Sequence, residues 1–456
     1  MDVVFLSRIQ FALTSMFHYI YPPMSIGLGL MMVILEGAYI LTKEEIYKTA
    51  TKFFTKIFAL TFALGVATGL VQIFGFGTNW GRYSEFVGDI FGSALAAEGV
   101  FAFFLEAGFL GIVLFGWNRV KPVTHFVSTC LLTFGAHFSA VWIVAANSWM
   151  QTPAGYKIIG EGQKAKAVVT DFWEMVLNHS TLTRVTHVIL GCWLAGIFLV
   201  ISISAYYYLK KKHLEIAKIS MKFSLIAAFI TLCLQLLSGH DSASQVAKYQ
   251  PAKLAAMEAV FKTEEYTPIT VFGWVDKENK TVKGLEVPGF LSFLVNGDFK
   301  TPVKGLDQIP KDEWPPLQVV FQSYHIMVAL WGLMFGLILI TAYLFKKQTL
   351  HNYPLLLKGL VLSVIFPQIA NQVGWITAEV GRQPWLVYGL LKTVDGISKR
   401  LTADQVSISI AMFIVIYIVL FFLFIYLLDK KIKHGPESSE DKRLDLFKNV
   451  YEKEIK

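Results

Sequence analysis

The sequence predicts an all-α polytopic membrane protein with nine transmembrane helices, an N-terminus outside and a C-terminus in the cytoplasm. Hydrophobic residues make up 54% of the 456 residues and charged residues only 16%, and the mean hydropathy is +0.52. Nine stretches contain the roughly 20 mostly apolar residues that a helix needs to cross a bilayer. Basic residues gather in the connections after the odd-numbered stretches, which the positive-inside rule places in the cytoplasm.

The predicted spans are separated by short connections, with one long exception. In chain order they cover 14–41, 53–75, 91–116, 124–147, 185–208, 219–239, 318–345, 355–379 and 406–428. The first domain, 1–239, therefore holds six spans, and 318–428 holds three. Residues 240–317 form an outside loop that is too long to be a simple connection. We expect a helix in its first part, 244–261, irregular structure over 290–316, and a cytoplasmic tail over 429–456.

Composition also excludes several classes of protein. The net charge of +8 lies in the connections between apolar runs, so it indicates membrane topology and not a nucleic-acid partner. Cys130, Cys192 and Cys233 are odd in number and lie within apolar stretches, which favours neither disulfides nor zinc. The first apolar run is long enough to span, and no cleavage pattern precedes it, so we expect no removed signal peptide.

The eighth span ends in an ionisable and aromatic segment, 374–385. Glu379 lies at this end, where a carboxylate is costly unless it is paired, hydrated or bound to a metal. Arg382 supplies a partner charge, and Trp375 and Trp385 supply flat apolar faces at the interface. The segment therefore predicts a functional site, and the alternative is an ordinary interfacial helix end with an aromatic belt.

Four side chains that can ligate haem iron lie at similar predicted depths in the outer half of the membrane. They are His18, His187, Met327 and Glu379. A His/Met pair makes a six-coordinate electron-transfer haem, and a single His or Glu leaves one position open for a gas. Taken singly, each histidine can be a hydrogen-bonded interfacial residue and Met327 can be core packing.

The third span carries Glu98 and Glu106, eight residues and about 12 Å apart along an α-helix. Because a carboxylate near the bilayer midplane is expensive, we expect it to be protonated, paired or part of a proton relay. Ser139 and Asn147 of the fourth span are candidate polar neighbours, whereas His137 favours ordinary interhelical hydrogen bonding. In the long loop, Lys253 and Glu258 can bind and deprotonate an amphipathic reductant, unless they simply form a solvated helix face.

Three motifs give the chain a resemblance to subunit I of cytochrome bd-type quinol oxidases, over essentially its whole length. The first is Ser7-Arg-Ile-Gln-Phe-Ala-Leu-Thr-Ser-Met-Phe-His18. The second is Phe62-Ala-Leu-Gly-Val-Ala-Thr-Gly69 with Phe76-Gly-Thr-Asn-Trp80, and the third is Gly381-Arg-Gln-Pro-Trp385. The loop is the short version, without the insertion that some members carry.

The resemblance implies three haems and assigns the candidate residues. His187 and Met327 would hold a low-spin haem b, and His18 and Glu379 a high-spin haem b and a haem d or further haem b. Glu98, Glu106, Ser139 and Asn147 would lie near the high-spin pair, together with Trp375 and Arg382. Lys253 and Glu258 would bind quinol. His325 occupies a position that is commonly Arg in the family, which affects the expected potential of the low-spin haem.

The implied protein is a terminal oxidase of a bacterial or archaeal cytoplasmic membrane. Its substrates would be quinol, oxidised outside, and O2, reduced to water with cytoplasmic protons. Its partners would be a second large membrane subunit, often a small single-span subunit, and the lipid bilayer. Two other classes remain open at this stage: a haem b membrane subunit of a dehydrogenase, and a proton-coupled transporter.

Overall fold

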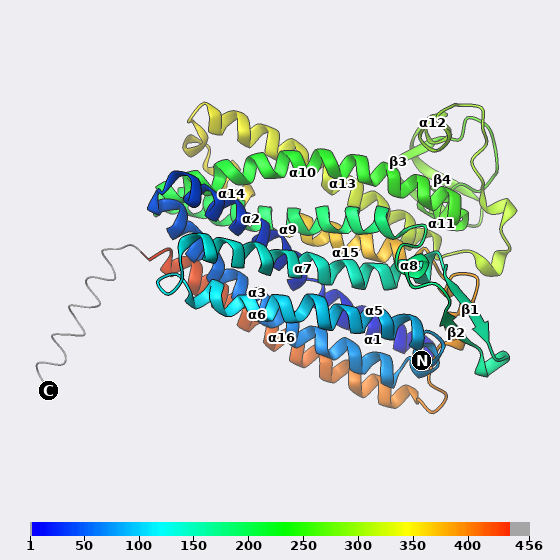
Figure 1. Cartoon of the computed structure of the whole chain (residues 1–456). Helices are drawn as coiled ribbons and strands as arrows, with labels where there is room; N and C mark the ends of the chain where they lie inside the picture. The colour runs from blue at the N-terminus through cyan, green and yellow to red at the C-terminus, as the bar shows by residue number, and fades with distance from the viewer. Residues whose placement is uncertain (1, 438–456) are drawn as a thin grey trace, which may run out of the picture.

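The long helices of the protein run side by side in one elongated bundle (Figure 1). This computed structural model describes residues 2–437. Within them, nine helical stretches are long and apolar enough to cross a membrane, as the sequence predicted. The strands, α11 (Pro251–Met257) and α12 (Phe290–Asn296) cluster at one end, which we call the loop end, and α16 (Ala403–His434) finishes at the other, the tail end. The described chain begins at the loop end with α1 (Val3–His18) and finishes at the tail end with α16, so its first and last described helices end on opposite sides.

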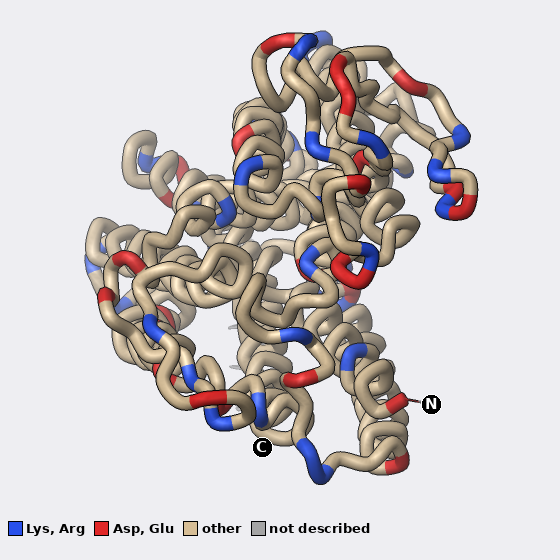
Figure 2. Tube along the Cα trace, turned by 90° about the vertical axis from the view of Figure 1, so that its right-hand side faces the viewer, with Lys and Arg blue, Asp and Glu red and all other residues tan. Residues whose placement is uncertain are grey.

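The spanning stretches are made of single helices or of helices in series. They are α1 (Val3–His18) with α2 (Tyr21–Thr42), α3 (Glu45–Thr78), α5 (Gly88–Ala97) with η1 (Glu98–Phe103) and α6 (Phe104–Phe115), α7 (Pro122–Gln151), α9 (Thr181–Lys210), α10 (Leu214–Tyr249), α13 (Leu317–Lys346), α14 (Pro354–Leu362) with α15 (Ile365–Val380), and α16. Charges of both signs lie on the connecting segments at the loop end (Figure 2).

The first span is longer than predicted and is broken in the middle. It begins at Val3, because the polar Gln10 is satisfied inside the bundle: its Nε2 donates to Ser409 Oγ (2.8 Å), and its Oε1 accepts from Asn79 Nδ2 (2.6 Å). The predicted start at 14 is therefore wrong. The helix breaks after His18, and Pro22 and Pro23 follow in the first turn of α2, where proline is tolerated.

The core packs α2, α3, α9 and α10 around a closely spaced helix pair. A Cβ built on Gly196 of α9 would lie 2.2 Å from the Gly27 carbonyl carbon of α2, so only glycine allows this approach. Small residues at such crossings let membrane helices pack backbone against backbone. Around the crossing, side chains such as Leu28, Met31 and Phe198 are fully buried.

The long loop is shorter and more ordered than predicted. α10 continues to Tyr249, ten residues beyond the predicted end of its span, so the connection covers 250–316. It contains α11, the antiparallel hairpin β3 (Ile269–Asp276) and β4 (Thr281–Val287), and α12.

The remaining short elements also flank the loop end. They are α4 (Gly81–Phe86), the hairpin β1 (Tyr156–Ile159) and β2 (Lys166–Val169), α8 (Phe172–Val176), and the small pair β5 (Trp385–Val387) and β6 (Leu391–Lys392). The predicted tail, 429–456, begins inside α16, and its part from 438 onward lies outside the described residues.

One π-helical turn, η1, separates the two acidic residues of the third span. In a regular α-helix a spacing of eight residues would rotate Glu106 about 80° away from Glu98. A π-turn contains one residue more per turn, which reduces that offset to about 20°. The two carboxyl groups therefore project from nearly the same side of the helix, and the regular α-helix assumed in the sequence analysis is wrong.

Candidate functional site

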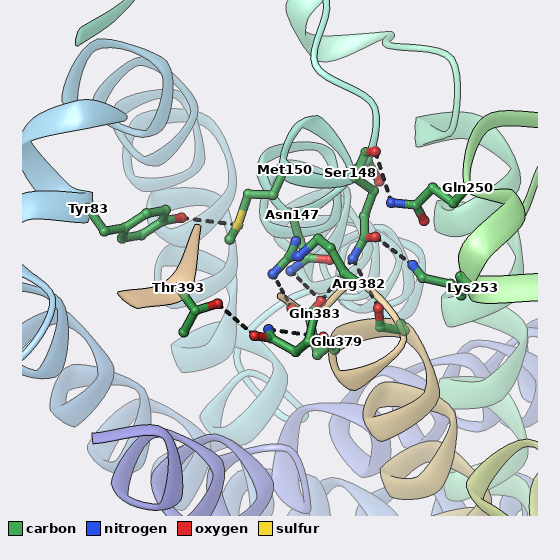
Figure 3. A network of polar contacts seen from close by, with 12 residues as sticks. Tyr83, Asn147, Ser148, Met150, Gln250, Lys253, Glu379, Arg382, Gln383 and Thr393 are labelled. Atoms are coloured by element: carbon green, nitrogen blue, oxygen red, sulfur yellow. Dashed lines mark hydrogen bonds and ion pairs between the residues drawn. The ribbon is translucent and has the colours of Figure 1, made fainter. Parts of the chain in front are cut away.

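A buried hydrogen-bond network surrounds Glu379 at the loop end (Figure 3). Arg382 Nη2 donates to its Oε2 at 2.5 Å, and Asn147 Nδ2 and Gln151 Nε2 donate to its Oε1 at 3.0 and 3.3 Å. Lys253 Nζ in turn donates to Gln151 Oε1 at 2.6 Å. The predicted residues Glu379, Arg382, Asn147 and Lys253 thus belong to one cluster, which α7, α11 and the end of α15 build together.

Arg184 of α9 is a member of this network that sequence reasoning missed. Its Nη2 donates to Asn147 Oδ1 at 2.5 Å and its Nη1 to Ser148 Oγ at 3.1 Å. The signal was present in the sequence, because an arginine near the start of a membrane span, three residues before His187, calls for a partner.

The network carries more positive than negative charge. Arg184, Lys253 and Arg382 surround the single carboxylate of Glu379. Arg382 is 3% exposed, and its Nε and Nη1 have no hydrogen-bond partner among residues 2–437. Buried charged donors without acceptors are costly. The cluster therefore fits an anionic group, and haem propionates are anions of this kind.

Lys253 is buried, and it points into this network. The alternative of a solvated helix face is wrong, because Lys253 and Glu258 are only 4% and 3% exposed. The Lys253 side chain crosses α15 where a residue larger than glycine would clash: a Cβ on Gly381 would lie 2.8 Å from Lys253 Cγ. Burial lowers the pKa of the Lys253 ammonium well below its usual value, and the nearby Arg184 and Arg382 act in the same direction.

Glu258 faces a different space, an apolar cavity of about 500 Å³ lined by residues such as Val271, Phe290 and Tyr324. The Tyr324 hydroxyl and the Thr270 backbone amide approach its carboxyl group. Its Oε2 is buried and has no partner within the described part of the chain. Burial raises the pKa of Glu258 to about 7. This cavity can hold a flat apolar ring whose hydroxyl donates to the carboxylate.

His325, also on the cavity wall, ties α13 to the hairpin. Its Nδ1 lies 2.8 Å from the Phe321 carbonyl oxygen and its Nε2 lies 2.7 Å from the Thr270 carbonyl oxygen. The ring therefore fixes the strand that carries Thr270 above Glu258.

His187 and Met327 lie at the same level of the bundle, as predicted. Gly191 of α9 and Asn371 of α15 are in contact and define one level, since a Cβ built on Gly191 would lie 2.5 Å from Asn371 Oδ1. His187 is one turn from Gly191 toward the loop end. Gly374 is about one turn from Asn371 in the same direction, and the Met327 sulfur packs against it, 2.9 Å from a Cβ built there.

The His187 ring is held by polar neighbours on α10. Its Nδ1 lies 3.0 Å from Ser238 Oγ, which leaves Nε2 as the nitrogen that can ligate iron. The Gln235 Nε2 lies 3.1 Å from that nitrogen. The Gln235 Nε2 also donates to the His187 backbone carbonyl oxygen at 3.3 Å, whereas its buried Oε1 has no partner in residues 2–437.

His18 lies close to the level of His187, but Glu379 does not. The Gln372 side chain of α15 donates to the Met16 carbonyl, which places the end of α1 near Gln372. Glu379 is seven residues, or about 10 Å, farther along α15 toward the loop end. The prediction of one shared depth therefore holds for three of the four residues.

The His18 ring is held by α3. Its Nδ1 lies 3.0 Å from Thr68 Oγ1, and its edge packs on Gly69. This contact again leaves Nε2 as the candidate iron ligand. The Trp375 ring of α15 lies 6.3 Å from the Phe11 ring of α1, about two turns from His18 toward the loop end. No cluster of three or more metal-ligating His, Cys, Asp or Glu residues occurs in the described chain, whereas axial haem ligation requires only one or two.

α7 also contacts both acids of the third span. Ser139 Oγ donates to Glu98 Oε1 at 2.7 Å. A Cβ built on Gly135 of α7 would lie 3.1 Å from the backbone nitrogen of Glu106, so the two helices are in contact there. The residue Glu106 is 7% exposed. His137 makes one ordinary interhelical bond, as expected: its Nε2 accepts from Trp193 Nε1 of α9 at 2.7 Å, and its Nδ1 lies 2.7 Å from the Thr133 carbonyl oxygen on its own helix.

Comparisons with known proteins agree over nearly the whole chain. The sequence model of the family described as cytochrome bd terminal oxidase subunit I matches residues 6–436. Cytochrome bd ubiquinol oxidase subunit 1 of Bacillus subtilis is 36% identical, covering 100% of this chain and 99% of that protein. A putative cytochrome bd menaquinol oxidase subunit I of the same organism is 32% identical over 94% of this chain and 96% of its own length.

Proteins from other bacteria agree as well. The cytochrome bd-II ubiquinol oxidase subunit 1 of Escherichia coli is 31% identical, covering 97% of this chain and 98% of that protein. The solved structure of the bd oxidase from Geobacillus thermodenitrificans superimposes with a TM-score of 0.87 at 31% identity, covering 95% of this chain and 99% of that one. The chain therefore belongs to the cytochrome bd terminal oxidase subunit I family, whose members are haem-containing, multi-pass proteins of the bacterial cytoplasmic membrane.

Proposed function

We propose that this chain is subunit I of an electrogenic quinol:oxygen oxidoreductase. Quinol is oxidised at the loop end, outside the membrane, and O2 is reduced to water with protons taken from the cytoplasm at the tail end. The observation that carries the proposal concerns Glu258, which lies at the wall of an apolar cavity of about 500 Å³. Its carboxylate oxygen Oε2 is buried and has no hydrogen-bond partner among residues 2–437. Apolar walls with few polar groups are typical of small-molecule sites.

Glu258 is the group that receives a quinol proton. Its raised pKa, about 7, matches general-base work near neutral pH. Tyr324 lies against the same carboxyl group and positions it. Lys253 was expected to bind quinol beside Glu258, but its ammonium bonds to Gln151, and we assign it to anion binding at the Glu379 network.

The haem groups fit the donor set of this chain. His187 and Met327 would hold a low-spin haem b. His18 and Glu379 would serve two high-spin haems, one haem b and one haem d or further haem b. The Nε and Nη1 donors of Arg382 have no acceptor among the described residues, and propionate oxygens would be suitable acceptors for them. When bound, haem supplies redox-active iron that accepts electrons singly and binds O2.

The acids of the third span supply the proton route in this proposal. Every candidate ligand lies toward the loop end, so protons from the cytoplasm must cross the rest of the bundle. Glu106 is buried within α6, and Glu98 continues the route toward the loop end through its bond with Ser139. Charge then crosses the membrane without a pump, because quinol oxidation and proton uptake use opposite sides.

A second large membrane subunit completes the enzyme in this proposal, with a small single-span subunit as a further partner. The relatives are named as subunit 1 or subunit I of their oxidases. One relative is named for ubiquinol and another for menaquinol, so the quinol must be identified by assay.

The first test is a dithionite-reduced minus air-oxidised spectrum of membranes that contain this chain with its partner subunits, repeated with carbon monoxide. A far-red chlorin band that shifts with carbon monoxide supports haem d at an open oxygen site. Only b-type bands, with one fraction binding carbon monoxide, support the haem b variant. Absence of any carbon-monoxide-reactive haem contradicts the oxidase and favours an electron-transfer subunit.

The second test addresses the quinol cavity. Glu258→Gln keeps the size of the side chain but removes the base, so kcat/KM for quinol should fall at least about tenfold in oxygen-uptake assays. Glu278→Gln, on the exposed turn between β3 and β4, is the matched control and should leave the rate unchanged. Equal rates for Glu258→Gln and its control would contradict the assignment of the cavity.

A further inference from the structure

A second buried polar cluster lies near the tail end, far along α7 from the Glu379 network. Glu36 of α2 and His125 of α7 form its centre, with the carboxylate Oε1 2.6 Å from His125 Nδ1. Their side chains are 1% and 2% exposed. Thr129 Oγ1 donates to Glu36 Oε2 at 2.6 Å, and His125 Nε2 lies 3.2 Å from the Val113 carbonyl oxygen of α6.

The hydrogen bonds of this cluster determine where its protons are. A carbonyl oxygen can only accept, so His125 Nε2 carries a hydrogen that it donates to Val113. Glu36 Oε2 accepts from Thr129. One proton then lies between His125 Nδ1 and Glu36 Oε1, on either atom. The pair is neutral overall and holds one transferable proton, and every polar atom in it is satisfied.

The cluster lies directly below Glu106 along the seam between α6 and α7. His125 meets α6 at Val113, and Glu106 is seven residues earlier on α6. That spacing is two turns, so Glu106 lies on the same side of α6, about 10 Å toward the loop end. Thr129 and Thr133 occupy this interval on α7, and the buried Thr133 Oγ1 has no partner within residues 2–437.

Few other ionisable groups face the pair. The Cys130 thiol of α7 lies near Glu36. The Trp117 ring covers His125 at a centroid distance of 3.7 Å, and the Lys52 ammonium of α3 lies over Trp117 at 5.1 Å. The pair is thus shielded from the tail-end surface by one aromatic ring, while its hydroxyl neighbours continue toward Glu106.

We infer that Glu36 and His125 form the proton-loading site of this enzyme on the cytoplasmic side and supply protons to Glu106. This inference rests on the proposed function. A proton from the cytoplasm adds to the pair and gives an imidazolium beside a neutral carboxylic acid. Transfer of one proton toward Glu106 past Thr129 and Thr133 restores the neutral pair. No electron moves in this step, and each proton taken up is matched by one passed on.

Glu36→Gln is the sharpest test, because the amide can keep both bonds. Its oxygen accepts from Thr129 and its NH2 donates to a neutral His125, so the cluster stays satisfied but has no transferable proton. In the complete haem-loaded complex, reconstituted in vesicles, turnover with quinol should fall at least about tenfold and its D2O effect should increase. Haem spectra and thermal stability should match those of the parent, and Glu36→Asp should recover part of the rate.

Ser202→Ala is the matched control, since Ser202 also makes a buried side-chain bond in the tail-end half, to the Val361 carbonyl, but lies away from Glu106. It should leave turnover and the D2O effect unchanged. A Glu36→Gln rate within twofold of the parent, or a loss proportional to lost haem, would overturn the inference.

Glu106→Gln, assayed in parallel, separates this inference from the proposed function. If Glu106→Gln slows turnover and Glu36→Gln does not, the proposed function stands and the loading site is wrong. If the parent complex itself consumes no oxygen with quinol, the proposed function fails, and the inference fails with it.

Discussion

The two buried polar clusters on α7 differ in whether their hydrogen bonds are complete. Around Glu379, three basic side chains surround one carboxylate, and two donor nitrogens of Arg382 have no acceptor in residues 2–437. Around Glu36, the carboxylate, imidazole and hydroxyl satisfy one another, and the pair is neutral. Arg382 and Glu36 are 3% and 1% exposed, so contact with solvent does not account for the difference between these two side chains.

This difference separates a ligand site from a proton site. Buried donors without acceptors are costly, so the Glu379 network is arranged for an anionic group that completes it. A complete neutral cluster gains little from another ligand, but it can shift a proton without moving a heavy atom. In the two proposals made above, α7 therefore contributes to a cofactor site at one end and to a proton site at the other.

The largest expected effect is at Arg382. Arg382→Met removes the ion pair with Glu379 and leaves that carboxylate buried beside fewer cations. Removing one partner of a buried pair costs about 3–5 kcal/mol. We expect the haem content per complex to fall by half or more and the thermal unfolding midpoint to drop, as measured by haem extraction and calorimetry.

The control for Arg382→Met is an ion pair at the surface of the same end. Lys392 Nζ lies 3.3 Å from Asp312 Oδ2, and both side chains are exposed. Lys392→Gln should change stability by less than about 1 kcal/mol and leave haem content unchanged. Normal haem content in Arg382→Met would contradict the assignment of the network to an anionic cofactor group.

The next effect in size concerns pH and Glu258. With a pKa of about 7, the carboxyl group is mostly protonated below neutral pH and becomes a base above it. We expect kcat/KM for quinol to rise with pH up to about 7 and then to level off, whereas Glu258→Gln should lack this step. The measurement is oxygen uptake between pH 5.5 and 8.5, at roughly constant ionic strength.

Stability should respond to Glu258 in the opposite direction. Its folded pKa is raised above the ordinary value of 4.5, so the folded protein binds more protons between these values. The corresponding stability is fully present below pH 4.5 and is lost as pH rises through about 7. An activity profile identical to that of Glu258→Gln would show that Glu258 is not the titrating base.

Hydropathy predicted the nine spans but misplaced several ends, for local physical reasons. Span one starts at Val3 because Gln10, which lowers hydropathy, is paired inside the bundle. α10 extends to Tyr249, beyond the apolar stretch, because its end packs against α11 and not against lipid. The β3–β4 hairpin was missed because its strands are largely exposed and lie in a polar loop, so no buried apolar face marks them in the sequence.

The candidate site was predicted residue by residue, but its connections were not. Glu379 and Arg382 share a helix end and were paired correctly. Lys253 is buried because its side chain packs against Gly381, which is 128 residues away in the sequence. The polar composition of the loop around Lys253 does not indicate this burial. Glu36 and His125 could have been found, because each is an ionisable residue within a predicted span.

The smallest expected effect tests whether the Glu36 cluster is complete. Thr129 is fully buried and donates to Glu36, so Thr129→Val should cost about 1–3 kcal/mol through the unpaired carboxylate oxygen. Thr133 lies one turn away on the same helix, and its buried hydroxyl has no partner in the described chain. Thr133→Val should therefore be neutral or stabilising by up to about 1 kcal/mol. Thermal unfolding of the two purified complexes compares them directly. Equal losses of stability in Thr129→Val and Thr133→Val would show that α7 is equally sensitive at both positions. The distinction between a complete cluster and an isolated hydroxyl would then be wrong.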